Sequence, residues 1–188
     1  MEKYVNHPKC IAIGECGLDY FRLPEDEFEK QENIKKQKEV FISQIEFAKK
    51  VKKPLIVHIR EASNDSRQIL MDYNAKEVGG VLHCYNASEH LLPLSEHNFY
   101  FGIGGVLTFK NAKKLIEVLP KIPKDKLLIE TDAPYLTPHP HRGERNEPYY
   151  TVFVAQKMAE LLESSFEEIQ NLTTNNAKKL FKEFSSLC

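Results

Sequence analysis

Short apolar runs alternate with longer amphipathic stretches from one end of the sequence to the other. The runs are continuously apolar, which is typical of parallel strands that are covered on both faces. We expect strands over residues 10–15, 54–59, 79–84, 99–104 and 126–132. No low-complexity linker interrupts the alternation, so the pattern predicts one α/β domain over residues 1–188.

The amphipathic stretches predict helices between and after the strands. The stretch over residues 30–52 repeats apolar residues every three or four positions, as one face of a helix does. Further helices are expected over residues 64–73, 88–97, 111–119 and 148–162, and Pro93 weakens the second of these. Ser165 and Glu168 have the spacing of a capping box and predict another helix, and an amphipathic segment follows over 175–184. Five strands in strict βα alternation fit either an open doubly wound sheet or part of a (β/α)₈ barrel.

Composition and charge narrow the class of protein. Hydrophobic residues make up 41% of the chain and charged residues 28%, so the chain can bury a core and is not disordered. The 26 Lys and Arg residues balance 27 Asp and Glu residues, which excludes a basic face that dominates the net charge. No apolar run approaches the roughly 18 residues of a membrane span, and the start MEKYVNHPKC lacks the apolar core of a signal peptide. We therefore expect a soluble cytoplasmic protein without a membrane partner, whose four cysteines are reduced thiols and not nucleophiles.

Four of the expected strands end in side chains that commonly bind metal ions: Glu15, His58, His83 and Asp132. The carboxyl ends of parallel strands converge, so we expect these side chains around one cavity. Imidazole and carboxylate ligands suit Zn²⁺, Mn²⁺, Co²⁺ or Mg²⁺, and the lack of thiolates argues against a structural zinc site. A divalent ion there activates water, and a second ion stabilises charge on a phosphate, so hydrolysis is favoured over redox chemistry.

Four motifs occur together with these side chains: IGECGLDYFR (13–22), KPLIVHIREA (53–62), GGVLHCYNAS (79–88) and LLIETDAPYLTPHPHRGERNEP (127–148). In this order they resemble the TatD family of metal-dependent deoxyribonucleases, from about residue 5 to the end. The resemblance implies a TIM-barrel hydrolase with the four strand-end side chains as metal ligands. It also implies that Glu15 and Asp132 are catalytic, that Asp132 assists proton transfer from water, and that the substrate is nucleic acid, with DNA expected.

Two motifs of the family are missing from this sequence. Barrels of this family begin with an HxH pair and have a GIHPH-like segment after the third strand, and neither occurs here. The chain therefore resembles an incomplete barrel of about five C-terminal βα units plus C-terminal helices, since a barrel of about 250 residues exceeds it by about 60. We expect an exposed apolar interior and open edges that favour strand pairing or oligomerisation.

The missing part also bears on activity. In the family pattern one metal relies on the HxH pair, so that site is expected to be impaired, whereas Glu15, His58 and His83 still hold one ion. We expect weak or no nuclease activity from this chain alone. Two alternatives stay open: a metal hydrolase of amides, esters or phosphomonoesters, and a non-catalytic remnant.

Several further residues are candidates for substrate contact. Arg22 and Arg60 lie just beyond strand ends, where a guanidinium grips a phosphate, and the structural alternative is an ion pair with Asp19 or Glu61. Arg142, Arg145 and Asn146, in the loop TPHPHRGERNEP, offer phosphate donors.

Three positions have expected supporting roles. Glu130 precedes Asp132 by two residues, so it shares a strand face with it and can orient a metal ligand. Asp19 is expected to fix a loop. The GIGG segment over residues 102–105 lacks the spacing of a dinucleotide turn, and crowding of the backbone explains its glycines better.

Overall fold

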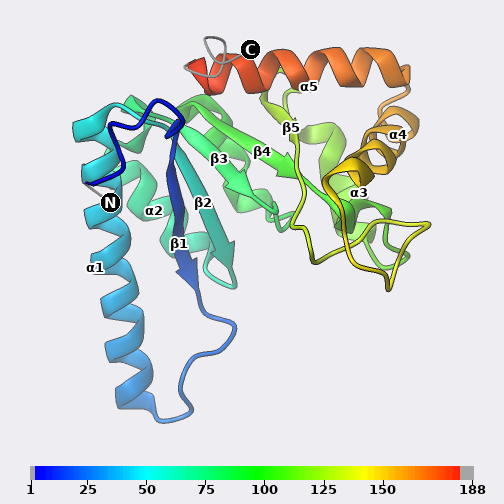
Figure 1. The fold of residues 1–188 in the computed structure, drawn as a ribbon. Helices are drawn as coiled ribbons and strands as arrows, with labels where there is room; N and C mark the ends of the chain where they lie inside the picture. The colour runs from blue at the N-terminus through cyan, green and yellow to red at the C-terminus, as the bar shows by residue number, and fades with distance from the viewer. Residues whose placement is uncertain (1–2, 183–188) are drawn as a thin grey trace.

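The computed structural model describes residues 3–182. Its centre is a parallel sheet in the order β1-β2-β3-β4-β5 (Figure 1), with the strands β1 Ile13–Asp19, β2 Leu55–Arg60, β3 Gly80–His83, β4 Phe99–Ile103 and β5 Leu127–Ile129. Each strand pairs with the next one along the chain, whereas a doubly wound sheet reverses its order at a switch point. The order is that of a barrel segment, and among the described residues β1 and β5 form its two edges.

The helices largely follow the amphipathic pattern. They are α1 Glu27–Val51, α2 Ser63–Asp72, α3 Lys113–Val118, α4 Thr151–Leu161 and α5 Phe166–Leu180. Short 3-10 helices cover Ala75–Glu77, Glu89–His97, Gly105–Thr108, Leu119–Lys121, Lys124–Lys126 and Pro148–Tyr150. The helix expected over 88–97 is thus a 3-10 segment, with Pro93 inside it, because proline cannot donate to an α-helical ladder.

The C-terminal helix begins as predicted. The Ser165 side chain accepts from the Glu168 amide and the Glu168 side chain accepts from the Ser165 amide, which is a complete capping box. The segment expected over 175–184 is not a separate element but the end of α5, and its last two residues lie outside the described range.

The two faces of the sheet bury different residues. On the outer face the helices cover a large core, whose strand residues are fully buried and include Leu55, Val57, Phe99, Phe101 and Leu127. On the inner face a small apolar layer of Val81, Tyr100 and Leu128 packs with Ile56 and with Leu180 of α5. In Figure 1, α5 crosses the end of the sheet opposite to the arrowheads.

This arrangement corrects the expectation of an exposed apolar interior. Val81, Tyr100 and Leu128 are only 5–8% exposed, because the end of α5 covers them. The side chain of Asn176 fixes α5 there by donating to the carbonyls of Lys124 and Leu127, both at 2.9 Å. The inner face beyond this layer, at the carboxyl ends of the strands, is where polar side chains lie.

Within residues 3–182, every helix is too short or too polar to cross a membrane.

Candidate metal-dependent active site

A cavity of about 630 Å³ opens at the carboxyl ends of the strands. Its wall includes the four predicted metal ligands, which are Glu15, His58, His83 and Asp132. Arg60 and Tyr135 line it as well. The structure therefore brings four side chains from separate motifs to one place, as the convergence of parallel strands requires.

The two histidines occupy paired positions on neighbouring strands, since His58 of β2 is in register with His83 of β3. Ile56 and Val81, two residues earlier, belong to the inner apolar layer. Because side chains alternate along a strand, both rings point to the same side as that layer. The inner face thus changes from apolar to polar within one step of two residues.

Glu15 reaches the cavity by a different route from the one expected. β1 pairs with β2 at Ile13 and Leu55 and next at Cys16 and Val57, so the register shifts at a bulge. Glu15 lies in this bulge, inside β1, and not at the end of the strand. A bulge redirects a side chain locally, and the continuous apolar pattern gives no sign of one. The residue that ends β1 is Asp19.

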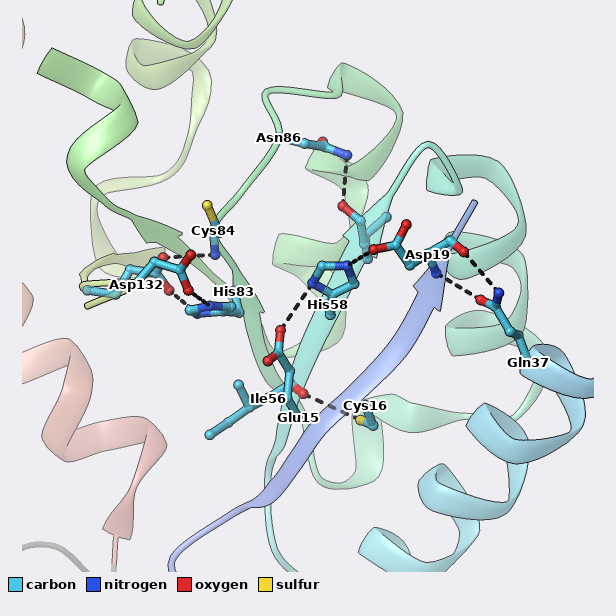
Figure 2. A network of polar contacts seen from close by, with 12 residues as sticks. Glu15, Cys16, Asp19, Gln37, Ile56, His58, His83, Cys84, Asn86 and Asp132 are labelled. Carbon is cyan, nitrogen blue, oxygen red and sulfur yellow. Dashed lines mark hydrogen bonds and ion pairs between the residues drawn. The ribbon is translucent and has the colours of Figure 1, made fainter. Parts of the chain in front are cut away.

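His58 lies between two carboxylates (Figure 2). Its Nδ1 is 3.1 Å from Oε1 of Glu15, and its Nε2 is 3.0 Å from Oδ2 of Asp19. Asp19 also accepts a hydrogen bond from the Phe21 amide at 2.9 Å, so it fixes the loop as predicted and contacts the histidine as well. Burial raises the pKa of Asp19, but the bonds from Phe21 and His58 outweigh it and hold that pKa below its ordinary value.

His83 has the same arrangement with two other carboxylates. Its Nδ1 is 2.7 Å from Oε2 of Glu130, and its Nε2 is 3.3 Å from Oδ1 of Asp132. The hydrogen bond to Glu130 raises the pKa of His83 to about 9, against the opposing effect of burial. Glu130 and Asp132 thus contact one imidazole, as expected. They do not share a strand face, however, because β5 ends at Ile129 and both residues follow it.

The side chains contact one another in pairs and do not share a common point. Within residues 3–182, no group of three or more His, Cys, Asp or Glu side chains converges closely enough to hold a metal ion as they lie. Glu15 contacts His58, and His83 contacts Asp132, so the expected single cluster is two adjacent pairs on one cavity. The donor chemistry nevertheless fits a divalent cation, because two imidazoles and two carboxylates face the same space.

The structure distributes the predicted substrate-binding residues unevenly. Arg60 lines the cavity and lies over the ring of Phe21, 3.5 Å from its centroid, and among the described residues it makes no ion pair with Asp19 or Glu61. Arg22 and Arg142 are exposed, with their guanidinium carbons 5.8 Å and 4.0 Å from the ring centroids of Phe21 and Phe109. Like the exposed Arg145, they are not part of the cavity wall.

Asn146 has a structural environment. It is 3% exposed, and its side-chain nitrogen donates to Thr131 Oγ1 at 3.1 Å and to the Tyr135 carbonyl at 2.6 Å. These bonds connect the loop to the segment that carries Asp132. The buried position of Asn146 therefore supports a structural role and not direct contact with a phosphate.

Two of the four cysteines, Cys16 and Cys84, are unsuited to nucleophilic catalysis, whereas Cys188 lies outside the described residues. Burial, with a further contribution from Glu15, raises the pKa of Cys16 to about 12. Burial, with nearby carboxylates led by Glu130, raises that of Cys84 to about 12. The thiolate is the reactive form, and neither residue forms it near neutral pH.

Sequence reasoning missed two features of the site. The contact of Asp19 with His58 follows from the rule that polar residues at strand ends meet, but that rule was applied to Glu15 instead. Tyr135, three residues after Asp132, is 71% exposed and lines the cavity. Nothing in the local pattern distinguishes it from other loop aromatics.

Comparisons with known proteins identify the family to which the chain is similar. Residues 1–182 match the family model described as TatD related DNase. The uncharacterized metal-dependent hydrolase YabD of Bacillus subtilis (strain 168) is 50% identical over 179 residues, which cover 94% of this chain and 67% of YabD. The uncharacterized metal-dependent hydrolase YcfH of Escherichia coli (strain K12) is 40% identical over 172 residues, which cover 91% of this chain and 62% of YcfH.

A solved structure matches as well. The crystal structure of YjjV, a TatD homolog from Escherichia coli K12, superposes with a TM-score of 0.84 at 27% identity, over 96% of this chain and 68% of that one. The chain thus spans 62–68% of the length of these three relatives. The five parallel strands accordingly correspond to part of the TatD TIM barrel. Since the family model matches residues 1–182 and YabD is 50% identical, the chain belongs to the TatD family of metal-dependent hydrolases.

Proposed function

We propose that this chain is a hydrolase of phosphodiester bonds of nucleic acid, with DNA as substrate and with weak activity when alone, using one or more divalent cations of the Mg²⁺, Mn²⁺, Zn²⁺ or Co²⁺ type. The observation that carries the proposal is the cavity in which two imidazoles and two carboxylates lie beside an arginine. The description of the family and the names of the relatives support metal-dependent hydrolysis. The choice of DNA goes beyond the names of those relatives.

Two residues of the cavity suit a nucleotide. The position of Arg60 over the Phe21 ring restricts the guanidinium, so less freedom is lost when it binds a phosphate with two parallel hydrogen bonds. The exposed ring of Tyr135 offers a stacking surface for a base, a contact that tolerates any base. A phosphate and a base next to it are features that a simple ester or amide lacks.

The carboxylates have distinct tasks in this proposal. Glu15, His58, His83 and Asp132 are the residues that would hold a divalent cation in this cavity. Such a cation would supply a lowered pKa of bound water and stabilisation of charge on a phosphate. Asp132 has a partly exposed side chain in the cavity and accepts the proton of the attacking water. The contact between Asp132 and Nε2 of His83 orients the Asp132 carboxylate. Glu15 contacts the other histidine of the cavity, His58.

The test uses the chain supplied with Mn²⁺, Mg²⁺, Zn²⁺ or Co²⁺ in turn, a single-stranded oligodeoxynucleotide and bis(p-nitrophenyl) phosphate. We expect hydrolysis that EDTA abolishes and that Asp132→Ala lowers by about 10²- to 10⁴-fold, the usual contribution of a positioned acid or base. Asp125→Ala is the matched control, because Asp125 is exposed in a 3-10 turn outside the cavity. The control is expected to retain the activity of the unaltered chain.

Other outcomes contradict the proposal in different ways. Turnover of p-nitrophenyl phosphate, an ester or an amide without turnover of the diester identifies another class of hydrolase. Hydrolysis that survives EDTA or Asp132→Ala excludes this site. No turnover with any of the four ions supports a non-catalytic chain.

A further inference from the structure

Asp19 and Glu130 make the same pair of contacts at opposite edges of the sheet. Each carboxylate uses one oxygen to accept a backbone amide at 2.9 Å, from Phe21 for Asp19 and from Cys84 for Glu130. The other oxygen of each reaches one nitrogen of a cavity histidine, at 3.0 Å for His58 and 2.7 Å for His83. Neither carboxylate is part of the wall of the main cavity, so both hold the histidines from behind.

A neutral imidazole has one N–H donor and one nitrogen that accepts, whereas an ionised carboxylate only accepts. His58 lies between Glu15 and Asp19, so its single proton can satisfy only one of them. The carboxylate that receives the proton decides which nitrogen is left with a lone pair. A metal ion binds the nitrogen with the lone pair, and the opposite N–H bond usually fixes the tautomer.

The surroundings of the two carboxylates differ. Asp19 is held at its backbone by Gln37, whose Oε1 accepts from the Asp19 amide and whose Nε2 donates to the Asp19 carbonyl, both at 2.9 Å. Its side chain is held by the Phe21 amide. Glu15 lines the cavity, and Oε1 of its side chain lies 3.1 Å from Nδ1 of His58 there, but no backbone amide is bonded to its carboxylate among the described residues. The fixed acceptor is therefore Asp19, and the movable one is Glu15.

We propose that Asp19 is a positioning residue that keeps the proton of His58 on Nε2 and leaves the Nδ1 lone pair directed into the cavity. Glu130 does the same for His83 with the nitrogens exchanged: Nδ1 donates to Glu130 and Nε2 faces Asp132. The two histidines thus present different nitrogens to one space. The inference that these nitrogens bind a metal ion rests on the proposed function, whereas the inference about the tautomer of His58 does not.

The first test observes the tautomer directly. Long-range ¹H–¹⁵N spectra of the metal-free chain, with the imidazoles neutral, distinguish a protonated Nε2 from a protonated Nδ1. We expect His58 to be protonated on Nε2. A His58 protonated on Nδ1 overturns the proposal. Because this experiment contains neither metal nor substrate, its result is independent of whether the chain hydrolyses phosphodiesters, and it needs no variant.

The second test replaces the acceptor by an isosteric amide. In Asp19→Asn the amide oxygen still accepts from Phe21, but the NH₂ group faces Nε2 of His58 and moves the imidazole proton to Nδ1. We expect that shift in the spectra and a 10- to 100-fold weaker binding of Co²⁺ by calorimetry, the usual cost of losing such a partner. A role in fixing the loop alone predicts neither change, since the bond to Phe21 is kept.

The matched control is Asp72→Asn, because Asp72 is exposed at the end of α2 and bonds only to Gln68 among the described residues. It is expected to leave both the His58 tautomer and the Co²⁺ affinity unchanged. Circular dichroism checks that Asp19→Asn is folded. A folded Asp19→Asn chain that keeps the proton on Nε2 and binds Co²⁺ within twofold of the unaltered chain overturns the proposal.

Discussion

Gly102 lies directly against the carboxylate of Glu130. A Cβ at position 102 would stand 2.8 Å from Cδ of Glu130, collide with its Oε2, and approach the carbonyl of Leu82 to 3.1 Å. The glycine on β4 therefore leaves the space in which Glu130 reaches His83 on β3. This close approach accounts for part of the GIGG segment, for which crowding and not a nucleotide was predicted.

Gly102→Ala should weaken metal binding without unfolding the chain. Glu130 is held by two hydrogen bonds and its side chain is 15% exposed, so it cannot yield to the new methyl group without losing a contact with His83 or Cys84. We expect the affinity for Co²⁺ to fall about 10- to 100-fold, as for other losses of a partner behind a ligand. Calorimetric titration measures the change, and circular dichroism checks the fold.

Gly104→Ala is the matched control on the same segment. A Cβ there meets Oε1 of Glu130 at 3.3 Å, a distance that a shift of a few tenths of an ångström relieves. Its effect on Co²⁺ affinity should therefore be clearly smaller. If the two substitutions lower the Co²⁺ affinity equally, the space that Gly102 leaves for Glu130 is not the reason for the loss.

Arg60→Ala should raise KM for an oligodeoxynucleotide while kcat changes little. Arg60 lines the cavity and stacks on Phe21, but its guanidinium contacts none of the proposed metal ligands. A charge-assisted hydrogen bond contributes about 1.5–3 kcal/mol, so its loss corresponds to a KM higher by about 10- to 100-fold. Steady-state kinetics on the metal-supplied chain separates the two constants.

Arg145→Ala serves as the comparison. Its side chain is 79% exposed and lies 3.7 Å from Glu147, outside the cavity. It should leave KM close to that of the unaltered chain. An increase in KM that is the same for both variants would indicate a general effect of charge and not a phosphate contact at Arg60.

The parts of the fold that follow from local pattern were predictable. The continuous apolar run before His58 predicts a strand over 54–59, and the structure has β2 at Leu55–Arg60. Ser165 and Glu168 predict the start of α5 because a capping box is made by residues three positions apart. In both cases the signal and the structure it determines lie within a few residues of each other.

The parts of the fold and the site that depend on contacts between distant residues could not be predicted from the sequence. Glu15 was placed at a strand end, because a bulge arises from pairing with β2 and leaves no mark in the apolar run. The interior was expected to be open, because no pattern in residues 166–180 shows that Leu180 packs on Val81 and Tyr100. Asp19 and His58 are 39 positions apart, so their contact is a product of the sheet register.

A pH-dependent contribution to stability should arise at Asp65. Its Oδ2 accepts from the Tyr20 hydroxyl at 2.8 Å and lies 2.7 Å from Nζ of Lys38. Burial raises the pKa of Asp65, but the bonds from Lys38 and Tyr20 outweigh it and lower that pKa below its ordinary value. A carboxylate whose pKa is lowered by folding stabilises the chain above its unfolded pKa of about 3.9, and this contribution is lost as the pH falls through the folded pKa.

Asp65→Asn should therefore be less stable than the unaltered chain at pH 6, and the difference should shrink as the pH falls below about 4. The side chain is 39% exposed, so we expect a difference of at most about 1 kcal/mol in the free energy of unfolding, measured by urea titration at each pH. Asp72→Asn on the same helix controls for the loss of a surface charge, since no cation pairs with Asp72 in the described part of the chain. If the difference for Asp65→Asn is the same at pH 6 and pH 3, the bonds to Tyr20 and Lys38 do not depend on the ionised carboxylate.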